Sequence, residues 1–185
     1  MPLLAALVLL ATTDEYAVYS AALAKIEFSH ASHNQKLVIL RDTLDPRKLP
    51  VPNESCWKLS KESRRRVDEV LAAHSISESR TLADKKLAIA RPYVLITQQQ
   101  ADEWQERLWP KIPTDPPSDA RSNPFPEASD LIRVSSILFN ANKTAGLVYI
   151  SAMCGPLCGL SQWYLVEKNQ GVWHVFSTPG CGTIS

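Results

Sequence analysis

The spacing of apolar residues changes along this 185-residue chain. Up to about residue 109 they recur at helical spacing, with two short β-branched runs between the helical segments. From residue 131 onward they follow a period of two, which is typical of strands. The first part therefore predicts helices separated by short strands, and the last part predicts a sheet.

Three helices are expected in the first part: one over about 13–28, one after Ser60, and one from Thr97 to Trp109. Thr12 and Thr97 each begin a capping box, in which two side chains satisfy the free N–H groups of the first turn. The residues expected to face inward are Tyr16, Tyr19, Leu23 and Ile26, then Val67, Val70, Leu71 and His74, then Ala101, Trp104 and Leu108. Short strands are expected at 36–43 and 93–96, because both segments hold compact apolar runs.

Four strand-length runs follow, at 131–139, 145–152, 161–168 and 171–178. The connections between them are short, which favours antiparallel neighbours and predicts a four-stranded meander. Aromatic residues are prominent in these runs, so one face of the sheet needs a cover that the helices can supply. The expected fold is α+β, with N-terminal helices packed on one face of a mainly antiparallel sheet.

The first eleven residues, MPLLAALVLLA, are an uncharged apolar run followed at once by polar residues. This length suits the hydrophobic region of a signal peptide and is too short to span a bilayer. We therefore expect export to an extracytoplasmic compartment, with membrane contact only through residues 1–11 if they are not removed. The alternative is a buried N-terminal strand or an extension of the first helix. Residues 12–185 are expected to form one domain, with a proline-rich loop at 110–128.

The four cysteines are Cys56, Cys154, Cys158 and Cys181, an even number that favours disulfides in an exported chain. Cys154 and Cys158 lie in CGPLCG, whose glycines and proline favour a tight loop that brings the two sulfurs together. The remaining pair would be Cys56 and Cys181. A zinc site usually needs a second cysteine knuckle, and a redox pair is more typically C-x-x-C at a helix N-terminus, so both are weaker alternatives.

Charge and composition exclude several function classes. Lys and Arg total 20 against 19 acidic residues, so bulk electrostatics indicate no nucleic-acid partner. The basic run KESRRR at 61–66 is interpreted as a solvated helix face rather than an anion site, since it lacks interleaved aromatics. His30 and His33 have no third ligand nearby, so no metal or cofactor is expected.

The C-terminal third resembles a family of exported bacterial proteins that have no assigned activity. The residues that carry the resemblance are Leu147–Ile150, the CGPLCG loop, Leu165–Lys168, Gly171–Trp173 and the terminal Ile184-Ser185. Glu15–Ser20 and the strand at 37–42 are also similar, whereas Pro156 and Gly180–Thr183 depart from the family pattern. The departure at Gly180–Thr183 is consistent with a Cys181–Cys56 bond. The resemblance implies export and transfers no catalytic residue.

The sequence holds none of the nucleotide-binding, metalloprotease or nucleophile-elbow motifs. The favoured function is therefore a non-catalytic binding module for an unknown protein or small molecule. Its recognition loop would be Gly155, Pro156, Leu157 and Gly159, held by the neighbouring cysteines, with the proline-rich loop as a second surface. The alternative is an exported hydrolase with a pocket between helices and sheet near Tyr149 and His174.

Overall fold

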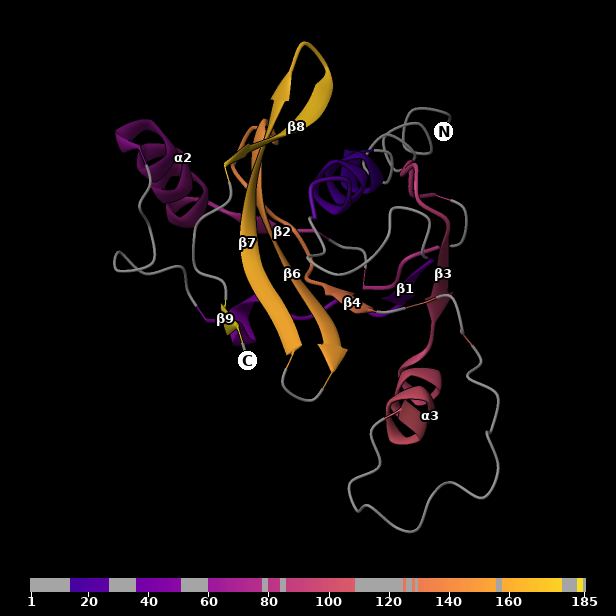
Figure 1. Cartoon of the computed structure of the whole chain (residues 1–185). Coiled ribbons are helices and arrows are strands. Elements are labelled where there is room, and N and C mark those ends of the chain that lie inside the picture. Colours follow the sequence, from indigo (N-terminus) through magenta and orange to yellow (C-terminus); the bar gives the residue numbers. More distant parts are fainter. Residues whose placement is uncertain are drawn as a thin grey trace, which may run out of the picture.

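Figure 1 shows the computed structural model of the chain. The structure describes residues 14–26, 36–50, 60–77, 80–83, 86–108, 125, 128, 130–155, 158–177 and 183–184. The leader at 1–11, Thr12, the histidine pair at 30 and 33, Cys56, Cys181 and the proline-rich loop apart from Phe125 and Ala128 lie outside these residues.

The elements follow one another from an N-terminal helix at 14–23 to a short C-terminal strand. They are β1 (Leu37–Leu40), the 3-10 turn η1 (Pro46–Lys48), α2 (Lys61–Ala72), β2 (Ser75–Ile76), β3 (Tyr93–Ile96), α3 (Gln98–Leu108), β4 (Leu131–Val134), β5 (Leu138–Phe139), β6 (Ala145–Gly155), β7 (Cys158–Asn169), β8 (Val172–Ser177) and β9 (Thr183–Ile184).

Two of the expected helix starts are confirmed by their hydrogen bonds. The Ser63 amide donates to Oγ of Ser60 at 3.2 Å, so Ser60 caps α2. At α3 the capping box is complete, because the Thr97 amide donates to Gln100 and the Gln100 amide donates back to Thr97, at 2.9 and 3.3 Å. The expected burial of His74 is wrong, since α2 ends at Ala72 and His74 is exposed beyond it.

The strands form one mixed sheet, and the expected mainly antiparallel sheet is wrong. β1 lies between β3 and β4 and pairs in parallel with both. β4 and β5 then pair antiparallel with β6, β6 with β7, and β7 with both β8 and β9. All four residues of β1 are buried, as in a parallel strand covered on both faces.

Helices cover both faces of this sheet, which corrects the expectation of one covered face. In Figure 1 the sheet curls around the N-terminal helix, while α2 and α3 lie outside the curl. We call the face toward the N-terminal helix the inner face and the face toward α2 and α3 the outer face. Residues alternate between the two, so Val148 and Ile150 of β6 point inward and Leu147 points outward.

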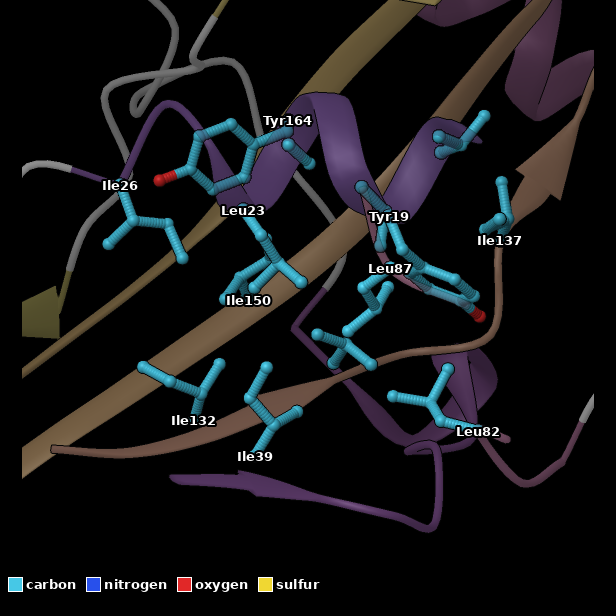
Figure 2. Packing of buried hydrophobic residues seen from close by; sticks show 14 of the residues in the cluster. Tyr19, Leu23, Ile26, Ile39, Leu82, Leu87, Ile132, Ile137, Ile150 and Tyr164 are labelled. Atoms are coloured by element: carbon cyan, nitrogen blue, oxygen red, sulfur yellow. The ribbon is translucent and has the colours of Figure 1, made fainter. Parts of the chain in front are cut away.

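Three apolar clusters hold the layers together. On the inner face, Leu23 points toward Ile150, while the Tyr19 ring points toward Ile137 (Figure 2). On the outer face, α2 packs through Val67 and Val70 onto residues of β5, β6 and β7. At the other end of the outer face, α3 packs through Ala101 and Trp104 onto Val38, Leu40 and Leu131. A stretch of outer face remains between these two helices.

A tight turn sets the position of β8. Asn169 pairs with Val172, and the two residues between them, Gln170 and Gly171, both have positive φ, at 48° and 84°. This is the conformation of a two-residue hairpin turn whose twist matches that of the strands, and glycine adopts it without strain.

Candidate functional site

The CGPLCG segment joins the two longest strands. Met153 pairs with Gly159 and Gly155 with Cys158, so Cys154 is an additional residue opposite this pair of positions. The backbone register thus places Cys154 next to Cys158. Pro156, Leu157, Cys56 and Cys181 lie outside the described residues.

Tyr149 and His174, the residues of the expected hydrolase pocket, are not brought together. The Tyr149 ring packs edge-on against Trp163 of the neighbouring strand, with 5.3 Å between ring centroids. His174 is exposed on β8 and lies opposite Glu167, four positions further along β7 than Trp163.

A charged cluster joins α2 to the sheet. Nε of Arg66 lies 3.0 Å from Oε1 of Glu167, although the geometry is too poor for a directed hydrogen bond. Arg66 also lies 3.4 Å from Glu69, whose other oxygen accepts a hydrogen bond from Asn140 at 3.2 Å. The single positive charge of the guanidinium is shared between two carboxylates, and this cluster joins α2 to β7. Of these contacts, the sequence indicates only the one between Arg66 and Glu69, because residues at i and i+3 of a helix are neighbours on its surface.

A second charged cluster fixes the N-terminal helix to the β7–β8 hairpin. Nζ of Lys168 lies 2.8 and 2.9 Å from the two carboxylate oxygens of Asp14, and Nε1 of Trp173 donates to the same carboxylate at 3.2 Å. The ammonium also lies 5.7 Å from the centre of the Trp173 ring. These contacts fix the start of β8 relative to the N-terminal helix.

The basic run at 61–66 is mainly a solvated helix face, as expected. Lys61, Arg64 and Arg65 are exposed, and with Asp68 they line a shallow hollow along one side of α2. Arg66 is the exception, because it turns toward the sheet. The hollow has no additional buried polar group among its described residues to mark it as an anion site.

The large apolar side chains that remain exposed in the described part of the chain are both on β8. Val172 is 56% exposed and Phe176 is 42% exposed, while Trp173 between them is buried. Phe176 is the additional residue of a bulge, since Val166 pairs with Val175 and Leu165 with Ser177. Among the described strands β8 pairs with β7 alone, so its other edge is unpaired. This surface was not expected from the sequence, although the strand-length run at 171–178 contains no Lys, Arg, Asp or Glu, which is a signal of an unprotected edge.

Groups with shifted pKa values do not cluster at any of the candidate sites described above. Burial raises the pKa of Tyr19, which lies in the inner core. Hydrogen bonds from Arg47 lower the pKa of Asp45 to about 2 at the start of η1. Catalytic groups usually show clustered shifts, whereas these two residues lie in separate parts of the fold.

The described residues lack two further features. They contain no group of three or more histidine, cysteine or acidic side chains placed to share a metal ion. None of the helices in the described ranges is long and apolar enough to cross a membrane.

Comparison with known proteins adds no relative. No protein-family model matches the chain, and neither a curated protein nor a solved structure matches it. The resemblance of the C-terminal third to exported bacterial proteins therefore remains a prediction.

Proposed function

We propose that this protein is a non-catalytic interaction module that binds an extended, apolar segment of a partner protein along β8. The observation that carries this proposal is the coincidence of two features on one strand. β8 has an unpaired edge within the described sheet, and it holds the exposed large apolar residues Val172 and Phe176.

An added strand would gain from both features. Unpaired N–H and C=O groups along an edge supply main-chain hydrogen bonds, and alternate side chains supply specificity. Natural edges are commonly protected by charge or proline, whereas VWHVFS has neither. The Phe176 bulge limits regular pairing to the first part of the strand and re-aims the Phe176 side chain.

The strand is also held in one conformation before any partner arrives. Trp173 is buried on the inner face, and its indole is bound to Asp14 together with Lys168. A preorganised edge loses little conformational entropy on binding, which favours affinity. The expected partner segment has apolar residues at alternate positions and no requirement for charge.

Peptide selection tests this proposal. We expect a random peptide library displayed on phage, selected on the full chain, to yield sequences with alternating apolar residues. Replacing Val172 and Phe176 together by lysine should weaken the selected peptides roughly tenfold or more, because two charges enter an apolar contact. A charge-matched control places lysines at Gln98 and Gln99, which are exposed on α3. Selected peptides without alternation, or peptides that bind both variants equally, would overturn the proposal.

We further propose that the protein is exported and carries two disulfides, Cys154–Cys158 and Cys56–Cys181. The even number of cysteines and the glycines and proline between Cys154 and Cys158 support this proposal. The intact mass of protein secreted in its own compartment should rise on reduction by two hydrogens for each disulfide. Peptide mapping should then join Cys154 to Cys158. Free thiols before reduction, or a mass increment of zinc, would contradict both the disulfides and the exported location.

A further inference from the structure

Arg133 of β4 occupies the stretch of outer face between α2 and α3 without a partner. Its side chain is partly buried, and its Nε–H group is buried and donates to no hydrogen-bond acceptor among the described residues. The guanidinium makes no hydrogen bond or ion pair with any residue that the structure describes. Arginine has five N–H donors and no acceptor, and buried polar groups are nearly always hydrogen-bonded. The lack of a partner for Arg133 is therefore unusual.

Hydroxyl side chains continue the row that Arg133 begins. Arg133 pairs with Ser151 of β6, and Ser151 pairs with Ser161 of β7. Cross-strand partners lie on the same face, so these positions form one line across three strands. Oγ of Ser161 donates to Oγ of Ser151 at 2.8 Å, which shows that the two serines face each other. We call these three positions the polar row.

The chemistry of the polar row is that of an anion acceptor. It holds one fixed positive charge and two serine hydroxyls, and no acidic residue. Apolar and aromatic neighbours border it at Tyr149 and Trp163 on one side, and at Leu131 and Met153 on the other. Water is therefore partly excluded beside the guanidinium, which strengthens a charge-assisted hydrogen bond there.

We propose that the polar row binds a carboxylate, with Arg133 as the charged anchor and Ser151 as the neutral donor, because the hydroxyl of Ser151 accepts from Ser161 and keeps its own proton for the ligand. The guanidinium offers Nε and Nη as a planar fork, and this fork matches the two oxygens of a carboxylate. A single arginine balances one negative charge, so a monovalent carboxylate fits better than a phosphate dianion. The carboxylate belongs either to a free organic acid or to a peptide end. This site does not depend on the partner strand at β8.

Backbone amide NMR of the full chain tests the proposal with two matched pairs of probes. Acetate and N-acetylglycine carry the carboxylate, free or at a peptide end, and acetamide and N-acetylglycinamide are their neutral equivalents. We expect saturable shifts at Arg133, Ser151 and Ser161 with the carboxylates and none with the amides. Tighter binding of N-acetylglycine identifies a peptide end, whereas tighter binding of acetate identifies a small acid.

Two substitutions separate this role from a nonspecific effect of charge. Arg133→Gln should abolish the shifts, and Arg133→Lys should weaken binding roughly tenfold because the fork is lost while the charge remains. The control Arg65→Gln removes an exposed charge from α2 and should leave the shifts unchanged. Equal shifts in wild type and Arg133→Gln, or no shifts in wild type, would overturn the proposal.

Thermal stability gives an independent readout. If Arg133 serves a ligand rather than the fold, Arg133→Met without carboxylate should melt at the same temperature as wild type or higher, because an unpaired buried polar group has been removed. Carboxylate should then raise the melting temperature of wild type alone. A lower melting temperature for Arg133→Met without any carboxylate effect on wild type would assign Arg133 to the fold and refute the site.

Discussion

Replacing Trp104 by alanine is expected to lower the free energy of unfolding by about 3–5 kcal/mol. Trp104 is fully buried and packs between α3 and the outer face of the sheet with Val38, Leu40 and Leu131. Its ring also meets Phe125 edge-on, with 5.6 Å between centroids. Alanine would leave a cavity where α3 contacts the sheet, since Trp104 and Ala101 are the buried residues among the described side chains of this helix.

Urea denaturation followed by circular dichroism measures this loss as a change in midpoint at constant slope. Gln99→Ala on the exposed side of the same helix is the control, and it should change the free energy of unfolding by less than about 0.5 kcal/mol. A loss below about 1 kcal/mol for Trp104→Ala would show that α3 does not depend on this contact for its position.

The helices could be predicted because their signals are local. Ser60 and Thr97 lie next to the amides that they cap, and the inward positions Val67, Val70 and Trp104 follow from the helical period alone. The prediction that His74 faces inward was wrong because the helical spacing in the sequence continues past Ala72, where the helix ends. Pattern alone does not fix a helix end to within a turn.

The parallel pairs could not be derived from neighbouring connections. β1 pairs with β3, and Val38 also pairs with Leu131, so each partner lies many residues away and beyond intervening helices. Short connections predict antiparallel neighbours and say nothing of strands joined by long crossovers. The sequences of β1 and β3 carry one indication of parallel pairing. They read LVIL and YVLI, without the alternation expected of a half-buried antiparallel strand.

The contacts around the candidate surfaces depend on residues that are distant in the sequence. Lys168 and Asp14 are separated by 154 positions, and the burial of Trp173 beside them is what leaves Val172 and His174 outward. Arg133 shows the same limit. Its place in a strand was expected, but its lack of a partner follows only from what β6 and β7 put beside it. The exposed residues of β8 and the unpaired guanidinium of Arg133 result from packing between distant residues, so neither could be predicted from the sequence.

Alkaline pH is expected to destabilise the protein through Tyr19. Burial is the main cause that raises the pKa of its phenol, with a further contribution from the charge of Glu15, while a hydrogen bond from Ser77 acts in the opposite direction. The hydroxyl donates to the carbonyl oxygen of Ser135 at 3.1 Å, a contact that requires the proton. A pKa that is higher in the folded state means that the folded protein holds this proton more tightly than the unfolded chain does. The contribution of Tyr19 to stability is therefore complete below about pH 10 and falls as the pH rises further, by about 1.4 kcal/mol per pH unit.

Urea unfolding of three proteins between pH 7 and pH 12 separates this effect from the titration of other groups. Tyr19→Phe should be less stable than wild type by about 1 kcal/mol at pH 7, because the hydrogen bond to Ser135 is lost. Above pH 10 its stability should fall less steeply than that of wild type, so that the two curves converge. Tyr149→Phe keeps Tyr19 and removes the same number of phenols, and it should retain the steep fall. Parallel curves for wild type and Tyr19→Phe across this range would show that the core of the inner face accommodates the ionised phenol, which its packing against Leu23 and Ile137 argues against.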